Sequence, residues 1–235
     1  MSSWKAKRFW TAATAEACDG GYTVRLDGRP VKTPAKAAFV VPTLVMAQAS
    51  AAEWDAQQGE VKPQTMPMTR SANSALDKII PQRAEVVGLL AAYGGTDLLC
   101  YRAVGPAELV ARQAAGWDPL IDWAATALGA PLVTTKGVVH VAQDPAVLAR
   151  LTARVDALSP FHLAGFHDLV AITGSLVLAL AVTEGRLTPP EAWALSRIDE
   201  TWQTEQWGAD EEATTLEEAR HAALLHAGRF YLLCG

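Results

Sequence analysis

The spacing of the apolar residues changes near Thr43, and this change constrains the fold more than any other feature of the sequence. Before it, residues 22–26 alternate apolar with polar side chains, which is the pattern of a half-buried β-strand. Asp27 and Gly28 then form a typical tight-turn pair, so we expect the chain to return as the second strand of a hairpin. After Thr43, apolar residues recur every three or four positions, as in helices. The sequence therefore predicts a β-rich part followed by a mainly helical part.

Local patterns after residue 43 predict mostly helices. They cover residues 43–59, 70–79, 81–93, 106–128 with a break at Trp117-Asp118-Pro119, 144–158, 160–184, 189–207 and 211–226. Two prolines favour an extended connector over residues 61–69, and we expect a domain boundary there. Strand-type residues predict strands near residues 132–143 and 229–234, and residues 37–42 are a candidate third strand of the N-terminal part.

The predicted fold class is therefore α+β. A small β-rich N-terminal domain with one helix is expected over residues 1–65, and a larger, mainly α-helical C-terminal domain over residues 66–235. Half of the residues are apolar and 19% are charged, which is typical of a compact globular protein. The three cysteines form no CxxC pair, so neither a disulfide framework nor a zinc site is expected.

Charge is distributed unevenly along the chain. Residues 1–80 carry ten Lys and Arg against seven Asp and Glu, a balance of +3, whereas residues 184–218 carry two against ten, a balance of −8. An acidic rear argues against nucleic-acid binding and favours either a basic partner or simple solvation. The most apolar segment, residues 169–182, is shorter than the ~20 residues needed to cross a bilayer, so no membrane insertion is expected. The first ten residues do not form a signal or transit peptide pattern.

The usual signatures of nucleotide, metal and nucleophile chemistry are missing. The Gly-Gly pairs at 20–21 and 94–95 lack the Lys-Ser/Thr of a phosphate-binding loop, so no nucleotide is expected. Two histidine pairs are each five residues apart, off a shared helix face, which argues against a metal site: His162 with His167, and His221 with His226. Ser175 lies in an apolar predicted helix, where bonding back to a carbonyl is its expected role. We therefore expect no metal, no cofactor and no catalytic residue.

The predicted helix over residues 189–207 has two unlike faces. Thr188 suits its N-cap and Gly208 its end. At 100° per residue, one face carries a core-type stripe of Leu195, Ile198 and Trp202, and the other carries Trp193, Glu200 and Trp207 with Arg197, Gln203 and Thr204 between them. A carboxylate between two indoles is unusual, because a charge loses hydration beside large apolar rings. The second face is therefore the candidate site of the chain.

Residue types alone leave the role of this face open. Glu200 either pairs with Arg197 or another internal cation, or belongs to a surface that holds another molecule. In a second alternative, Asp199, Glu200 and the acids at 210–212 supply the acid and base of a small-molecule hydrolase. In a third, the protein is a stable structural subunit of a larger complex.

Six stretches of the sequence, taken in order, resemble the F1-ATPase assembly chaperone family that acts on the α subunit, known from the mitochondrial assembly factor 2 type and its bacterial relatives. They span almost the whole chain and are specific as an ordered set. The stretches are KRFW at 7–10, LDGRPVKTP at 26–34, AAEWDAQ at 51–57, TDLLCYR at 96–102, WDPLIDWA at 117–124 and LSRIDETWQTEQWG at 195–208.

This resemblance implies a noncatalytic chaperone with a β-rich N-terminal and a helical C-terminal domain. It would bind newly made F1 α subunit before the β subunit joins, without consuming ATP. A bacterial member is expected in the cytoplasm, whereas eukaryotic relatives belong in the mitochondrial matrix. One departure is that mitochondrial members tend to continue with an E-W-A-H run after the Trp-Gly pair, where this chain has acidic residues at 210–212.

The resemblance also implies roles for individual residues. The family's E-x-x-Q-x-x-x-W-G pattern falls on Glu200, Gln203, Trp207 and Gly208, and its important glutamate is Glu200. Together with Trp193, the first three of these are the expected partner-binding residues. Residues expected to support the fold or the family motifs are Trp54, Asp55, Asp97, Arg102, Trp117, Asp118 and Gly208.

Overall fold

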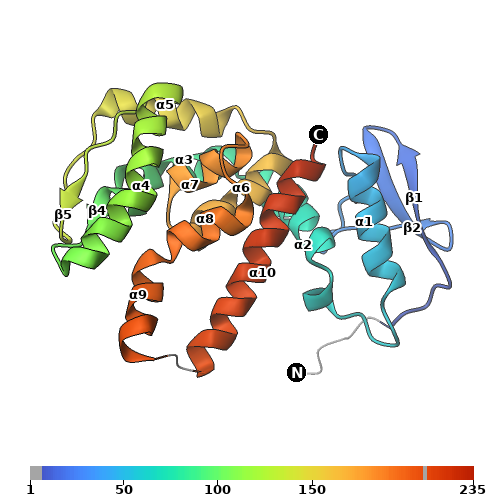
Figure 1. Cartoon of the computed structure of the whole chain (residues 1–235). Coiled ribbons are helices and arrows are strands. Elements are labelled where there is room, and N and C mark those ends of the chain that lie inside the picture. The colour runs from blue at the N-terminus through green and yellow to red at the C-terminus, as the bar shows by residue number, and fades with distance from the viewer. Residues whose placement is uncertain (1–6, 209–210) are drawn as a thin grey trace, which may run out of the picture. The chain divides into compact units, whose positions relative to one another are not determined.

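The computed structural model describes residues 7–208 and 211–235 (Figure 1). Two compact units account for this part of the chain. Unit 1 contains the residues up to Arg83 with Ser159–Gly165 and Arg229–Gly235, and unit 2 contains Ala84–Leu158 and Phe166–Gly228. The predicted α+β class is confirmed, since a small sheet precedes a mostly helical remainder. The predicted boundary between residues 65 and 66 concerns separately folding domains and stays a prediction.

The sheet of unit 1 is antiparallel, with the strand order β1-β2-β3. β1 (Ala13–Cys18) pairs with β2 (Gly21–Leu26), and β2 pairs with β3 (Arg29–Pro30). The predicted turn between β2 and β3 is present, with positive φ angles of 46° at Asp27 and 82° at Gly28.

The segment predicted as a third strand, residues 37–42, does not form one. The N–H of Phe39 donates to the carbonyl of Val31, whereas the N–H of Val41 donates to the carbonyl of Tyr22. Because the segment divides its hydrogen bonds between two partners, it makes isolated bridges and no ladder. β1 therefore completes the sheet instead.

Helix α1 (Leu44–Asp55) begins where the change of periodicity predicts and packs against β1 and β2. The Thr43 hydroxyl accepts the N–H of Met46 at 3.3 Å, so the predicted N-cap is confirmed. Near the end of α1, the Glu53 carboxylate accepts the N–H groups of Met68 and Thr69 at 2.6 and 2.8 Å. Glu53 thereby caps the start of the following helix from a distance in sequence.

The extended connector predicted over residues 61–69 is wrong. A 3₁₀ turn, η1 (Pro63–Thr65), is followed by α2 (Pro67–Ser74), which continues as the π-helical turn η2 (Ala75–Ile79). Proline at a first helical position loses no hydrogen bond, because the N–H groups there have no partner within the helix. The two prolines thus mark helix starts.

The chain from Arg83 onward is mostly helical. Its helical elements are α3 (Arg83–Ala92), η3 (Tyr93–Gly95), η4 (Leu98–Cys100), α4 (Ala107–Ala127), α5 (Pro145–Asp156), α6 (Pro160–Thr173), α7 (Leu176–Thr183), α8 (Pro189–Ser196), α9 (Ile198–Trp207) and α10 (Glu211–Leu233). The strand predicted near residues 132–143 shrinks to a two-residue parallel pair of β4 (Tyr101–Arg102) and β5 (Thr135–Lys136). Within the described residues, no helix is both long and apolar enough to cross a membrane.

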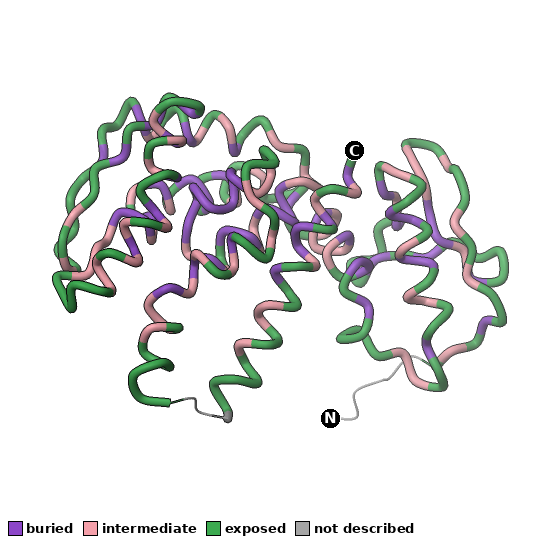
Figure 2. The backbone as a smooth tube through the Cα atoms, in the orientation of Figure 1, coloured by how far each residue is buried: buried purple, intermediate pink, exposed green. Residues whose placement is uncertain are grey.

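Helix α7 forms the centre of the core of unit 2. Its residues from Leu176 to Ala181 are all buried, as the tube in Figure 2 shows. α4 and α8 both pack against α7. A helix that is apolar on every side requires such enclosure.

Two helix boundaries differ from the prediction in opposite ways. α4 runs through Pro119 without the predicted break, because Trp117 and Leu120 on either side are buried and packing overrides the local preference. The helix predicted over residues 160–184 ends instead at Gly174, where φ is +69°. Ser175 then caps α7 by accepting the N–H of Leu178 at 3.0 Å, so its predicted role in a helix interior is wrong.

The strand predicted over residues 229–234 is also wrong, because α10 continues to Leu233. The side chains of Leu224, Ala227, Phe230 and Cys234 are buried. Spacings of three and four residues belong to one face of a helix. Aromatic and aliphatic residues favour strands locally, but this burial pattern decides for a helix.

Because α8 and α10 pack closely at Gly228, we expect replacement by Ala to have opposite effects on stability at Gly228 and at Gly88. A Cβ at Gly228 would lie 2.5 Å from Cγ of Pro189, whereas a Cβ at Gly88 in α3 would meet no atom within 4 Å. We expect Gly228→Ala to lower the free energy of unfolding by about 1–2 kcal/mol, because a proline ring does not yield easily. Gly88→Ala should raise it by about 0.5–1 kcal/mol through helix propensity. Urea denaturation of both variants measures this, and stabilisation by Gly228→Ala would contradict the close packing.

Candidate functional site

The helix predicted over residues 189–207 is two helices. Arg197 lies between α8 and α9 with φ −112° and ψ 17°, outside helical geometry. The carbonyl of Leu195, near the end of α8, accepts the indole N–H of Trp117 at 2.8 Å. Carbonyl groups in the last turn of a helix lack a donor within the helix, and Trp117 of α4 supplies the donor here. The predicted start and end are confirmed, since Thr188 forms a capping box with Glu191 and α9 stops before Gly208.

Because of this break, the candidate face is not continuous. Trp193 lies on α8, where its ring stacks on His221 of α10 at 5.0 Å between centroids. The guanidinium of Arg197 lies over the same ring, 5.5 Å from its centroid. Half-buried Trp193 thus packs beneath Arg197, and its contact with a partner stays a prediction.

Helix α9 is fastened to α4 by the side chains of one face. The guanidinium of Arg112 makes two 2.9 Å hydrogen bonds to the carboxylate of Glu205 and lies over the ring of Trp202 at 5.1 Å. Gln113 donates its amide N–H to Asp199 at 2.6 Å. Bidentate arginine pairs fix orientation as well as distance. The neighbouring face of α9, with Glu200 and Trp207, is therefore held in a defined direction.

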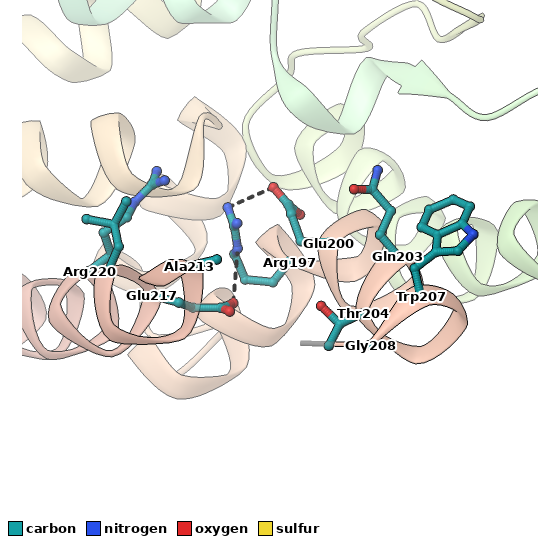
Figure 3. A pocket seen from close by; sticks show the side chains of 10 residues that line it. Arg197, Glu200, Gln203, Thr204, Trp207, Gly208, Ala213, Glu217 and Arg220 are labelled. Carbon is teal, nitrogen blue, oxygen red and sulfur yellow. Dashed lines mark ion pairs between the residues drawn. The ribbon is translucent and has the colours of Figure 1, made fainter. Parts of the chain in front are cut away.

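A hollow of about 370 Å³ lies between α9 and α10, and we call it the α9–α10 hollow (Figure 3). Three of the four predicted partner-binding residues line it, together with Gly208. The complete lining is Arg197, Glu200, Gln203, Thr204, Trp207, Gly208, Ala213, Leu216, Glu217 and Arg220. Trp193 does not belong to this lining.

The polar side of the hollow centres on Arg197. Its Nη1 lies 2.9 Å from Glu200 Oε1, and its Nε lies 3.6 Å from Glu217 Oε1. The arginine side chain is 16% exposed, whereas both carboxylates are 44% exposed. Internal pairing of Glu200, one of the two alternatives from sequence, is therefore present, but the carboxylate also faces the solvent of the hollow. Such an exposed pair contributes at most about 1 kcal/mol to stability.

The apolar side of the hollow is unusually exposed. Trp207 is 77% exposed and Leu216 is 62% exposed, and the two residues come from facing helices. Large apolar side chains that meet around a hollow mark a binding surface more often than single exposed ones do. The hollow thus combines the apolar contact area of Trp207 and Leu216 with the carboxylates of Glu200 and Glu217.

The α10 side of the hollow was missed in the sequence. Arg220 follows Leu216 by four residues and Glu217 by three, so all three lie on one side of the helix. A helical projection of residues 211–226 would have placed them together. Nothing local, however, indicates that this face lies opposite Glu200.

The predicted motif residues of unit 2 make contacts within that unit, and their expected role in supporting the fold stays a prediction. Buried Asp97 accepts hydrogen bonds from the hydroxyl of Ser175 at 2.7 Å and from the N–H of Val177 at 3.0 Å. Arg102 pairs with Asp118 at 2.6 Å and lies over the ring of buried Trp117. These contacts are internal.

Trp54 and Asp55 lie in unit 1. The ring of Trp54 packs edge-on against that of Trp10 at 5.3 Å between centroids, and Asp55 accepts a 3.2 Å hydrogen bond from Arg8. The arginine also donates to the carbonyls of Asp55 and Gln57 at the end of α1. The expected role of Trp54 and Asp55 in supporting the fold stays a prediction, because these contacts show how the two side chains pack and not how much they stabilise unit 1.

The described residues give little support to the hydrolase alternative. Asp199 is bonded to Gln113 and does not line the hollow, and Asp210 lies outside the described residues. The lining residues of the hollow include no histidine.

In the parts of the chain that the structure describes, no group of three His, Cys, Asp or Glu side chains is placed to hold a metal ion. Burial raises the pKa of Cys100 and Cys234 to about 12, so neither is a ready thiolate nucleophile.

Comparison with known proteins gives four consistent findings. The family described as ATP12 chaperone protein matches residues 7–125. The mitochondrial protein atp12 of Schizosaccharomyces pombe is 26% identical over 223 residues, which cover 90% of this chain and 77% of that protein. The crystal structure of Atp12 from Paracoccus denitrificans is similar with a TM-score of 0.95 and 52% identity, covering 98% of this chain and 99% of that one. A structure from Agrobacterium tumefaciens, of a protein thought to be a chaperone, has a TM-score of 0.90 and 41% identity over 97% of this chain and 85% of its own.

Proposed function

The chain belongs to the ATP12 family of ATP synthase assembly chaperones, and from this premise we propose that it binds the unassembled α subunit of F1-ATPase. In this proposal it shields the α-subunit surface that the β subunit later covers. It does so without catalysis, nucleotide or cofactor. One relative is mitochondrial, whereas the Paracoccus relative is bacterial. The proposal places this chain in the cytoplasm of a bacterium.

The observation that carries the proposal is the α9–α10 hollow, whose lining includes both exposed Trp207 and Glu200. A lone subunit of an obligate complex exposes apolar surface that promotes aggregation. Binding energy in protein interfaces comes mainly from a few aromatic anchors and well-placed charges. The hollow offers both, on a helix fixed by Arg112.

Release requires no energy source in this proposal. When β competes for an overlapping surface of α, mass action removes α from the chaperone. A chaperone of this kind would be absent from finished ATP synthase, which separates this function from that of a structural subunit.

Charge reversal at Glu200 tests the site. We expect Glu200→Lys to reduce recovery of β-free α subunit at least tenfold in a pull-down with tagged protein, because the new lysine would lie beside Arg197 and repel any basic group of the partner. A tenfold change corresponds to about 1.4 kcal/mol. The amount of α recovered per tagged protein is the measurement.

Glu218→Lys is the matched control. Glu218 is exposed on α10 and does not line the hollow, so the same charge change there should leave recovery within twofold of wild type. Equal recovery with wild type and Glu200→Lys would contradict the role of Glu200. No recovery with wild type would contradict the choice of partner.

A further inference from the structure

A single arginine joins two acids from different helices in the α9–α10 hollow. Figure 3 shows Arg197 between Glu200 of α9 and Glu217 of α10, with an ion pair to each. The guanidinium is the least exposed of the three groups, so it lies below the carboxylates as seen from solvent. We call Glu200 and Glu217 the acid pair.

The acid pair keeps unused bonding capacity. An ionised carboxylate accepts up to about four hydrogen bonds, and the pair contacts Arg197 through one oxygen of each group. The second cation of the lining, Arg220, is directed elsewhere, because it donates to the carbonyl of Ile172 at 3.3 Å. The two carboxylates therefore share one guanidinium, and together with Arg197 they carry a net charge of −1, whereas Arg220 keeps its positive charge elsewhere in the lining.

The sequence segment that contains the acid pair is itself acidic. Residues 184–218 carry ten acids against two bases, and a field of one sign attracts ligands of the other. Trp207 and Leu216 add apolar contact area to the same hollow. An occupant that satisfies both features is a polypeptide segment with a Lys or Arg side chain next to apolar ones.

We propose that Glu217 acts with Glu200 to receive one Lys or Arg side chain of the bound polypeptide, while Trp207 and Leu216 contact its apolar neighbours. Arg197 is a positioning residue, which holds the acid pair at the separation that one cation can bridge. This inference rests on the proposed function only for the identity of the polypeptide. The chemistry of the segment follows from the hollow itself.

The first test uses the α subunit. We expect Glu217→Gln to weaken binding of β-free α five- to tenfold in a titration by surface plasmon resonance and to reduce the salt dependence of the affinity. Glu218→Gln removes the same charge one residue away and should stay within twofold of wild type. If wild type binds α and Glu217→Gln binds equally well, the inference is overturned and the proposed function stands.

The second test does not depend on α. Two synthetic helical peptides of fifteen residues would share their Leu and Ala positions and differ only in having Arg or Glu at the remaining positions. The ¹⁵N-indole NMR signal of Trp207, identified by its loss in Trp207→Phe, should shift with the Arg peptide and not with the Glu peptide. The shift should need at least fivefold more peptide in Glu217→Gln. Equal responses to both peptides, no response to the Arg peptide or an unchanged titration in Glu217→Gln would overturn the inference.

A third test distinguishes whether Arg197 positions the acid pair or competes with the ligand for it. Removing a positive charge should favour a basic ligand if Arg197 only competes for the acids. If Arg197 positions them, Arg197→Gln should weaken binding of the Arg peptide, and Arg197→Lys should recover part of the loss. Tighter binding by Arg197→Gln would show competition and overturn the positioning role. Urea denaturation of both variants would establish that they remain folded under the binding conditions.

Discussion

Replacing Trp117 by Ala is expected to lower the free energy of unfolding by about 3–5 kcal/mol, which is the largest loss we expect from a single truncation. Trp117 is 1% exposed, and the guanidinium of Arg102 lies 5.4 Å from the ring centroid. Its indole N–H also bonds the carbonyl of Leu195, just before the break at Arg197. The substitution would therefore create a cavity and leave a carbonyl without its partner.

Urea denaturation followed by circular dichroism measures this loss, and two further variants separate its causes. Trp117→Phe keeps most of the ring but removes the N–H, so it should cost about 1–3 kcal/mol. Trp207→Ala is the matched control, because the same residue type at an exposed position should change the free energy of unfolding by no more than about 0.5 kcal/mol. Similar losses from Trp117→Ala and Trp207→Ala would contradict the packing described for Trp117.

The second large effect is expected at Asp97. Truncation to Ala would leave the hydroxyl of Ser175 and the N–H groups of Leu99 and Val177 without their acceptor in a buried place. We expect Asp97→Ala to cost about 3 kcal/mol, because each buried donor without a partner carries a penalty of about 1–3 kcal/mol that relaxation reduces. Asp122, exposed on α4, provides the control, and Asp122→Ala should be within about 0.5 kcal/mol of wild type.

Asp97 also predicts a pH dependence. Burial raises the pKa of its carboxyl group, an effect that outweighs the hydrogen bonds it accepts from Val177, Ser175 and Leu99. A folded-state pKa above the unfolded-state value stabilises the fold below the unfolded-state pKa of about 3.9, and this contribution disappears as the pH rises through the folded-state pKa. Wild type should therefore lose stability relative to Asp97→Asn, which does not titrate, between pH 4 and pH 7. Urea titrations at both pH values measure the difference, and a constant or rising advantage of wild type would contradict the raised pKa.

Elements with a local cause could be predicted from the sequence. The Asp27-Gly28 turn and the caps at Thr43 and Thr188 depend on residues within a few positions of each other. The same holds for the end of α9 before Gly208. The α+β order follows from the change of periodicity near Thr43, which the structure confirms.

The candidate site was predicted in part. Glu200, Gln203 and Trp207 were selected from their pattern and from the family resemblance, and the structure brings them to one hollow. Trp193 was selected with them because a continuous helix would align all four side chains. The break at Arg197 removes that alignment, since a non-helical residue rotates the following turns relative to the preceding ones.

By itself, the sequence determined the α+β class, most of the helix starts that it predicted and the family, because each of these depends on neighbouring residues or on an ordered set of motifs. Only the tertiary structure decided where α8 gives way to α9, that Asp97 supports α7, and that Glu217 lies opposite Glu200. The bonds from Trp117 to Leu195 and from Ser175 to Asp97 each join residues 78 positions apart. Such contacts arise when the chain packs, and no local pattern of residues specifies which distant group will be the partner.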